Sequence, residues 1–267
     1  MRHLLRDRLN RILRRLATWN VNSIKARLPI VRDWLSANSP DVAVLQEIKT
    51  PDFPTLEFEA LGYRCLWVGQ KSYNGVAILS KLPIEPAGRE LPGGDGDDHA
   101  RFIAADIAGL HVINIYLPNG NPVATEKFPY KLAWMDRLYR HLKGLLDAER
   151  PFVIGGDFNV IPEDIDCYDP RAWTGDALFQ PETRGRYRAL LNMGLTDALR
   201  TVDPRPHVYT FWDYQAGRWQ RDQGIRIDHW LLSPEAADRL EDCVVDRGPR
   251  GLEKASDHTP VVLTLRD

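Results

Sequence analysis

Residues 111–120, HVINIYLPNG, begin with an apolar run rich in isoleucine and valine and end in polar side chains. Such a run predicts a buried β-strand, and the proline and glycine that follow it predict a turn. Tyr116 stands where the strand ends, and Asn119 lies in the turn. The stretch therefore predicts a strand that delivers polar groups to one end of a sheet.

The same arrangement recurs along the chain. Apolar runs predict strands over 16–21, 42–46, 75–79, 102–107, 111–117, 152–154, 225–232 and 261–265. Apolar residues at helical spacing predict helices over 28–37, 128–146, 187–193 and 235–240. No repeat or linker divides the chain, so the pattern indicates one α/β domain with a mixed sheet content.

The composition sets limits on the class of protein. The chain has 267 residues, of which 43% are apolar and 27% charged, which excludes a disordered chain, a collagen or a coiled-coil rod. No apolar run approaches the roughly 18 residues that cross a bilayer, so we expect no stable membrane insertion. The three cysteines are odd in number and far apart. They indicate a reducing compartment, and we expect a cytoplasmic protein.

Residues 1–15 differ from the rest of the chain. They hold six arginines and a single acid, with leucines at helical spacing, and predict a basic amphipathic extension ahead of a domain over 16–267. Such a helix suits a membrane surface, an anionic partner or a targeting receptor. The same residues are equally typical of a solvated appendage or of translation from an upstream start codon.

Polar residues gather where the predicted strands end or begin, and Asp228 interrupts the strand predicted over 225–232. The set is Asn20, Glu47, Tyr116, Asp157, Asn159, Asp228, Asp257 and His258. Each alone fits a cap, a turn or a surface charge equally well. Ligands of α/β proteins, however, bind beyond the strand ends where loops converge. We therefore expect one assembled site.

The residue types suit attack of water on a phosphate ester. Glu47 offers a hard oxygen ligand for Mg²⁺ or Mn²⁺. Asp157 is suited to orient or deprotonate a water, and Asn159 would lie on the same face if that stretch is extended. Together these groups predict metal-assisted hydrolysis.

A histidine–acid pair and neutral donors complete this chemistry. His258 can donate to a phosphoryl oxygen, and Asp228 would fix its tautomer and favour the imidazolium. Tyr116 and Asn20 can donate to further phosphate oxygens. The sequence lacks the phosphate-binding loop of NTPases, the nucleophile elbow of serine hydrolases and the H-E-x-x-H of zinc proteases, which excludes those three classes.

From Leu16 to Asp267 the chain resembles the exonuclease III type of abasic-site endonuclease, within the endonuclease/exonuclease/phosphatase superfamily. The segments that carry the resemblance are TWNVNSIKAR (18–27), DVAVLQEIK (41–49), GVAILSK (75–81), INIYLPNG (113–120), GGDFN (155–159), FWDY (211–214), RIDHWLLS (226–233) and SDHTPV (256–261). QE, GDxN and SDH are shared across the superfamily, whereas NSIKAR, QEIK, FWDY and RIDHWLLS resemble the DNA-repair branch more narrowly. The basic extension lies outside the shared pattern.

The resemblance implies a four-layer α/β sandwich, in which two packed mixed β-sheets are flanked by helices. It implies that Glu47 binds the metal with Asn20 and Asp257 near it. It implies that Asp157, with Asn159 beside it, activates the water. Tyr116 would face the phosphate, and His258, supported by Asp228, would contact it.

The resemblance also implies the substrate, which is duplex DNA cut on the 5′ side of an abasic site, with digestion or dephosphorylation of 3′ ends as further activities. Phe211, Ile225 and Ile227 would form an apolar pocket for the abasic sugar, although strand core residues would show the same pattern. Candidate contacts to flanking phosphates are Arg27, Lys49, Lys71 and Arg101, each of which is equally a solvated charge.

We expect a monomer that acts at the nucleoid. The alternatives are another phosphoesterase of the same fold, acting on RNA or a phospholipid, and a non-catalytic DNA-binding protein. The amphipathic extension favours the phospholipid version, and binding without turnover would favour the last.

Overall fold

The computed structural model describes residues 14–266. Its strands are β1 (Arg15–Asn20), β2 (Val42–Gln46), β3 (Arg64–Val68), β4 (Val76–Ser80), β5 (Glu85–Gly88), β6 (Phe102–Ile107), β7 (Leu110–Tyr116), β8 (Phe152–Asp157), β9 (Thr196–Asp197), β10 (Asp228–Leu232), β11 (Leu240–Val245) and β12 (Val261–Leu265). Its α-helices are α2 (Ile24–Asn38), α3 (Thr55–Glu59), α4 (Lys127–Asp147), α5 (Pro170–Trp173), α6 (Pro181–Asn192), α7 (Ala198–Val202) and α8 (Pro234–Ala237).

The strands form two sheets of six strands each. Sheet A has the order β11-β12-β1-β2-β4-β3, and sheet B has the order β5-β6-β7-β8-β10-β9. Each sheet holds one parallel pair, β1 with β2 and β7 with β8, and its other neighbours are antiparallel. The mixed sheets confirm the predicted fold class.

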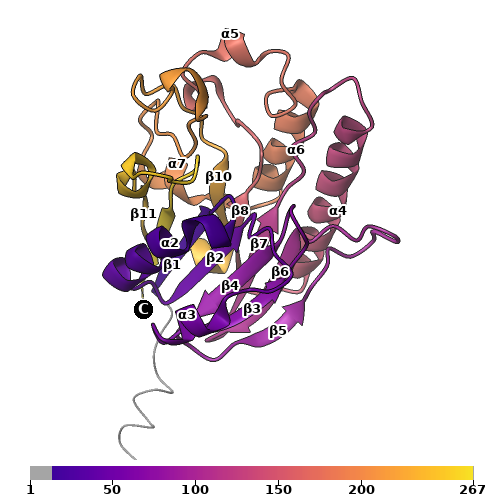
Figure 1. The fold of residues 1–267 in the computed structure, drawn as a ribbon. Coiled ribbons are helices and arrows are strands. Elements are labelled where there is room, and N and C mark those ends of the chain that lie inside the picture. Colours follow the sequence, from indigo (N-terminus) through magenta and orange to yellow (C-terminus); the bar gives the residue numbers. More distant parts are fainter. Residues whose placement is uncertain (1–13, 267) are drawn as a thin grey trace, which may run out of the picture.

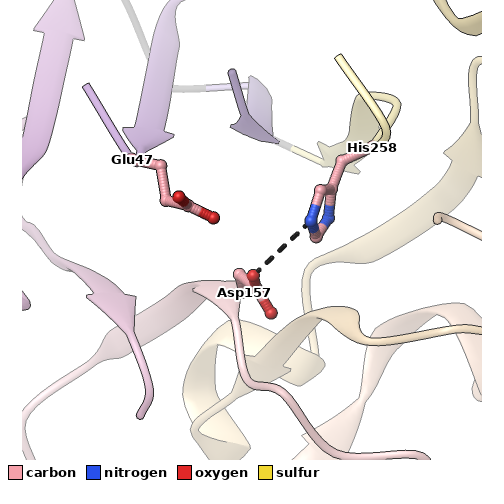
Figure 2. A group of neighbouring side chains, drawn as sticks. All are labelled: Glu47, Asp157 and His258. Atoms are coloured by element: carbon pink, nitrogen blue, oxygen red, sulfur yellow. Dashed lines mark ion pairs between the residues drawn. The ribbon is translucent and has the colours of Figure 1, made fainter. Parts of the chain in front are cut away.

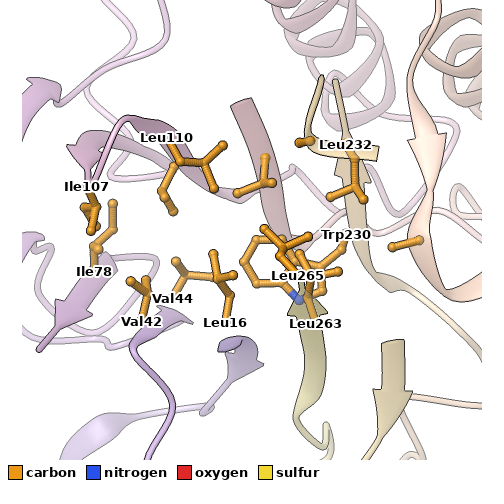
Figure 3. Packing of buried hydrophobic residues seen from close by; sticks show 14 of the residues in the cluster. Leu16, Val42, Val44, Ile78, Ile107, Leu110, Trp230, Leu232, Leu263 and Leu265 are labelled. Carbon is orange, nitrogen blue, oxygen red and sulfur yellow. The ribbon is translucent and has the colours of Figure 1, made fainter. Parts of the chain in front are cut away.

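The two sheets pack face to face, and helices cover their outer faces (Figure 1). Alternate residues of the inner strands, such as Val44, Ile78 and Val112, meet between the sheets in one buried cluster (Figure 3). The other face of sheet A packs against α2 and α3. The other face of sheet B packs against α4 and α6. These are the four layers that the resemblance implied.

A buried amide fixes how the two sheets lie against each other. Asn114 of β7 is fully buried, and its Nδ2 donates to the carbonyl oxygens of Leu45 (2.9 Å) and Ala77 (2.8 Å) in sheet A. Its Oδ1 accepts from Gln46 Nε2 at 2.8 Å. A buried polar group without partners costs about 1–3 kcal/mol, so sliding one sheet past the other is unfavourable.

All eight predicted strands are present, with bounds shifted by a few residues, and the four strands that were not predicted are β3, β5, β9 and β11. Those four are the two edges of each sheet. Edge strands have one open side and carry charged or exposed residues there, as in β5, where three of four residues are exposed. The apolar runs used for prediction mark interior strands only.

Two predicted elements need correction. The run 225–232 is a regular strand only from Asp228, because Ile225 instead forms isolated bridges with Cys167 and Phe211. The helix predicted over 235–240 is the single turn α8, and Leu240 already begins β11. The predicted extension over 1–15 falls almost wholly outside the described residues, although Arg15 belongs to β1. Among residues 14–266 no helix is long and apolar enough to cross a membrane.

Two glycines of β8 allow a close approach that other residues would prevent. A Cβ on Gly155 would lie 2.4 Å from the ring of Trp230, which is fully buried between the sheets. Gly156 has φ +154°, and a Cβ there would lie 2.0 Å from the carbonyl oxygen of Ile115. The sequence GGD thus places Asp157 at the end of a strand that packs unusually close to its neighbours.

Gly155→Ala should lower the free energy of unfolding by about 1–3 kcal/mol, the usual cost of overpacking a core, because the Trp230 ring has to move. Urea denaturation measures this change. Gly144→Ala is the matched control: Gly144 lies within α4 with no atom near its Cβ position, so alanine should stabilise by up to about 1 kcal/mol. An unchanged unfolding free energy for Gly155→Ala would contradict the packing described.

Candidate active site

The predicted polar residues meet at one end of the sandwich. Asn20 ends β1, Glu47 follows β2, and both come from sheet A. Tyr116 and Asp157 end the parallel strands β7 and β8 of sheet B, where they are register partners. Asp228 begins the antiparallel β10 directly beside Asp157. His258 precedes β12. The site is therefore built from both sheets.

Glu47, Asp157 and His258 point toward one another at the centre of this end (Figure 2). One potential ligand atom from each lies within 4.8 Å of the other two. His258 Nε2 lies 3.7 Å from Asp157 Oδ2. Two carboxylates at this separation are the hard oxygen donors that Mg²⁺ and Mn²⁺ prefer. The residues present therefore fit a divalent cation.

The Asn20 amide joins the two carboxylates. Its Nδ2 donates to Glu47 Oε1 and to Asp157 Oδ2, each at 2.9 Å, and the side chain is fully buried. Its Oδ1 accepts from the Asn22 N–H at 3.0 Å. In this arrangement Asn20 holds the carboxylates in place through its NH₂ group. Both N–H groups of Asn20 are thereby used, so the prediction that Asn20 donates to a phosphate oxygen is wrong. Its predicted part in metal binding stays a prediction.

Glu47 is kept ionised by its surroundings. Burial alone raises the pKa of this carboxyl, but the charge of Lys49 and hydrogen bonds from Asn20 and Lys49 outweigh it, and the net pKa is lowered. Lys49 Nζ lies 2.9 Å from Glu47 Oε2 and also donates to Asn22 Oδ1 at 2.6 Å. Asp257, which accepts from Asn22 Nδ2 at 3.1 Å, lies at the rim of the same centre.

His258 is held as an imidazolium by Asp228. Its Nδ1 lies 2.8 Å from Asp228 Oδ2, and Asp228 is fully buried. Burial lowers the pKa of His258, but the charges of Asp228 and Asp157 raise it to about 10. Thr210 secures the pair because its hydroxyl donates to Asp228 Oδ2 at 2.6 Å. At neutral pH the Nε2–H therefore faces Asp157 as a charged donor.

Asp157 and Tyr116 have raised pKa values for the same reason. Burial raises the pKa of Asp157 to about 7, against the opposing charge of His258. A carboxyl with this pKa can take up or release a proton near neutral pH. Burial, and then the charges of Glu47 and Asp157, raises the pKa of Tyr116 well above its ordinary value. Tyr116 therefore stays protonated and is a donor.

The stretch from Asp157 to Asn159 is not extended, so the condition under which Asn159 would share the face of Asp157 is not met. β8 ends at Asp157, and Asn159 has φ +47°. Its backbone N–H donates to Asp157 Oδ1 at 2.9 Å, which makes an Asx turn. The turn still brings the Asn159 amide into the site, where its Oδ1 accepts from Asn119 Nδ2 at 3.2 Å.

A pocket of about 300 Å³ opens beside the carboxylates. Phe211, Ile225 and Ile227 are among its lining residues, and the Phe211 ring lies edge-on to His258 with 4.9 Å between centroids. Trp173 and Leu178 also line it. They belong with the two isoleucines to one apolar cluster. The pocket thus has an apolar body and a polar, acidic mouth.

The four predicted basic contacts occupy different surroundings. Arg27 donates to the Asn22 carbonyl at 2.6 Å and to the Tyr214 hydroxyl at 3.0 Å. Arg101 lies over the Tyr116 ring, 4.7 Å from its centroid. Lys71 is exposed in the loop before β4. Lys49 is bound to Glu47 within the acidic centre, so it is not a flanking surface charge.

Sequence reasoning missed several residues of the site. Lys131 of α4 is fully buried, and its Nζ donates to the carbonyl oxygens of Asn119 (3.1 Å) and Asn159 (2.5 Å), which ties two site loops together. Burial lowers its pKa to about 7. A lysine among the apolar positions of a predicted helix was the available signal. Trp173, Leu178 and Thr210 gave no comparable signal, because no regular apolar pattern surrounds them.

The chain is similar to known proteins in both sequence and fold. The model of the endonuclease/exonuclease/phosphatase family matches residues 17–258. The chain is similar to exodeoxyribonuclease III of Haemophilus influenzae, with 35% identity over 91% of this chain and 97% of that protein. A Neisseria 3′ phosphatase, solved bound to a product DNA hairpin, is 41% identical with a TM-score of 0.92, covering 95% of this chain and 100% of that one. An AP endonuclease from Archaeoglobus fulgidus is 40% identical with a TM-score of 0.90, covering 94% and 98%.

Asp228→Asn should lower the pKa of His258 from about 10 toward or below its ordinary value of 6.5, because the nearest negative charge is removed. NMR titration of the imidazole in metal-free protein measures this. In the wild type the raised pKa means that the pair's contribution to stability is complete below pH about 6.5 and is lost as the pH rises through about 10.

Asp106→Asn is the matched control for that titration, because Asp106 pairs with another histidine, His111, at 2.8 Å. It should change the titration of His111 and leave that of His258 as in the wild type. A His258 titration that is the same in Asp228→Asn and in the wild type would show that Asp228 does not hold the imidazolium.

Proposed function

The chain belongs to the endonuclease/exonuclease/phosphatase family, and from this premise we propose that it is a divalent-metal-dependent DNA-repair nuclease. It hydrolyses the phosphodiester on the 5′ side of an abasic site. The observation that carries the proposal is the acidic centre of Glu47, Asp157 and His258 beside a pocket with an apolar body. The centre suits phosphate-ester hydrolysis, and the pocket suits a sugar without a base.

Mg²⁺ or Mn²⁺ would be held by Glu47, with Asp157 and Asp257 beside it. Glu47 has the lowered pKa that a metal ligand needs, since it must be ionised to bind. When bound, the cation supplies Lewis-acid polarisation of a phosphoryl oxygen and offsets negative charge in the site. The orienting hydrogen bond from Asn20 fixes Glu47 for that role.

The remaining chemistry comes from the protein's own groups. Asp157, when ionised, accepts a proton from the attacking water at its Oδ2 or Oδ1, and a pKa of about 7 suits a general base at neutral pH. The His258 imidazolium donates from Nε2 to a phosphoryl oxygen, where negative charge develops. Tyr116 and Asn159 supply further neutral donors.

The pocket selects the substrate by its size and surface. A deoxyribose without a base is smaller than an intact nucleotide, with a hydroxyl in place of the base at C1′, and it has to leave the helix to reach the site. Phe211, Ile225 and Ile227 offer an apolar surface to it. We propose that the same centre also acts on 3′ ends, as an exonuclease or 3′-phosphatase. The names of the Haemophilus and Neisseria relatives support this.

The DNA around the lesion is the proposed partner. Arg27, Lys71 and Arg101 are the candidate contacts to flanking phosphates. We propose that the protein binds duplex DNA as a monomer, in the cytoplasm. The cysteines are free, which agrees with a reducing compartment.

A 5′-labelled duplex with one abasic-site analogue should be cut immediately 5′ to the lesion in Mg²⁺ and left intact in EDTA. Asp157→Asn should lower kcat by about 10²–10⁴-fold, the usual contribution of a general base. Asp147→Asn, an exposed carboxylate of α4 paired with Lys143, is the matched control and should cut like the wild type.

The cleavage pattern separates the alternatives. Shortening of the DNA from its 3′ ends, with no cut at the lesion, would show that the protein acts as an exonuclease and not as an abasic-site endonuclease. A duplex that stays uncut in both Mg²⁺ and Mn²⁺ would contradict the proposed function. RNA and phospholipids would then be the substrates to test. Near wild-type turnover by Asp157→Asn would show that another group accepts the proton.

A further inference from the structure

Side chains of the segment 225–227, at the floor of the pocket, alternate between two environments. Ile225 and Ile227 face the pocket. Arg226 stands between them and is fully buried. A guanidinium is almost never buried without charged partners, because removing it from water is costly. The position of Arg226 behind the pocket floor therefore requires anionic partners in the interior.

Arg226 lies in a buried ion cluster, which we define as Asp166, Asp197, Arg200 and Arg226. Arg226 binds Asp166 with two hydrogen bonds, Nε to Oδ1 at 2.7 Å and Nη2 to Oδ2 at 3.2 Å. Its Nη1 donates to Asp197 Oδ2 at 2.9 Å. Arg200 also donates to Asp166. Two positive and two negative charges make a neutral set.

The charges of the buried ion cluster are permanent at neutral pH. Burial raises the pKa of Asp166 and of Asp197, but the charge of Arg226 outweighs it, and both pKa values are lowered. Next to the cluster, His229 accepts from Arg226 Nη1 through Nδ1 at 3.0 Å and donates from Nε2 to the Val160 carbonyl at 3.0 Å. Burial lowers its pKa to about 4, so it remains neutral.

The buried ion cluster connects the floor of the pocket to a second lining segment, here called the wall, which carries Trp173 and Leu178. Asp166 directly precedes Cys167, which bridges to Ile225, and the Asp166 carbonyl accepts from the Arg226 N–H at 2.8 Å. From Cys167 the chain continues through α5 to Trp173 and Leu178, which line the pocket. The bidentate Arg226–Asp166 pair thus adds to the backbone hydrogen bonds that fix the spacing between floor and wall.

We propose that the buried ion cluster sets the width of the pocket and thereby determines selectivity for an abasic sugar over an intact nucleotide. Its members are positioning residues, since none lines the pocket itself. The inference rests on the proposed function, because it concerns the substrate preference of the same site. Apolar packing between floor and wall would allow sliding, whereas a bidentate arginine–carboxylate pair has one favoured geometry.

The selectivity ratio tests this inference. It is kcat/KM for cutting at an abasic site divided by kcat/KM for digestion of an undamaged 3′ end, measured for each variant below its melting temperature. Loss of folded protein lowers both activities equally and leaves the ratio unchanged. A wider pocket admits intact nucleotides, so the ratio should fall, by about tenfold for Arg226→Met, the scale of discrimination by pocket fit.

Three further variants keep the test decisive if Arg226→Met does not fold. Arg226→Lys keeps the charge but loses the second hydrogen bond, and it should lower the ratio less than Arg226→Met. Arg200→Met leaves the Arg226–Asp166 pair in place and should lower the selectivity ratio least. Arg186→Met is the matched control, since Arg186 binds Asp136 with two hydrogen bonds of 2.8 and 3.1 Å between α6 and α4. It should leave the ratio unchanged.

Each outcome supports or overturns the inference. An unchanged ratio in the folded Arg226 and Arg200 variants would show that the buried ion cluster only stabilises the fold, and it would overturn the inference while the proposed function stands. A ratio that falls equally in Arg186→Met would also overturn it. A wild-type protein that does not cut at the abasic site would remove the proposed function and this inference with it.

Discussion

The structure depends on two buried amides that join its sheets. Asn114 of sheet B donates to two carbonyl oxygens of sheet A between the layers. Asn20 of sheet A donates to a carboxylate from each sheet at the end of the sandwich. Because each amide loses about 1–3 kcal/mol without its partners, the sheets pack in one relative position. Glu47 and Asp157 come from different sheets, so that position also assembles the site.

In the site, neighbouring cations and amides offset the cost of burying negative charge. Asp228, Asp157 and Glu47 are three acids at the end of two sheets, and each is matched by a cation or an amide. Neighbouring charges and hydrogen bonds offset the burial of these acids to different degrees, so the acids have different pKa values and different chemistry. Lys49 keeps Glu47 ionised, whereas burial brings the pKa of Asp157 to about 7. One group is thereby suited to hold a cation and another to move a proton.

Elements with a regular apolar pattern could be predicted from the sequence, whereas elements and contacts without such a pattern could not. Interior strands carry continuous apolar runs, and all were predicted, whereas edge strands such as β3 carry mixed residues because one side faces solvent. The polar residues of the site were found because they interrupt or follow apolar runs. Asn159 was placed by assuming extended backbone, and a left-handed turn replaces it. Arg226 was missed because its buried charge is recognisable only once its partners, distant in sequence, are known. Lys131 was missed although it stands among the apolar positions of a predicted helix.

Glu47 and Asp157 come from different sheets, and the proposed cation site requires that the sheets bring them together. Anomalous scattering from crystals grown with Mn²⁺ tests this most directly, because manganese scatters anomalously and the protein's light atoms scarcely do. We expect a peak at the Glu47 carboxylate, beside Asp157, in the wild type and its loss in Glu47→Gln. A peak bound elsewhere, or one that survives Glu47→Gln unchanged, would contradict this assembly of the site.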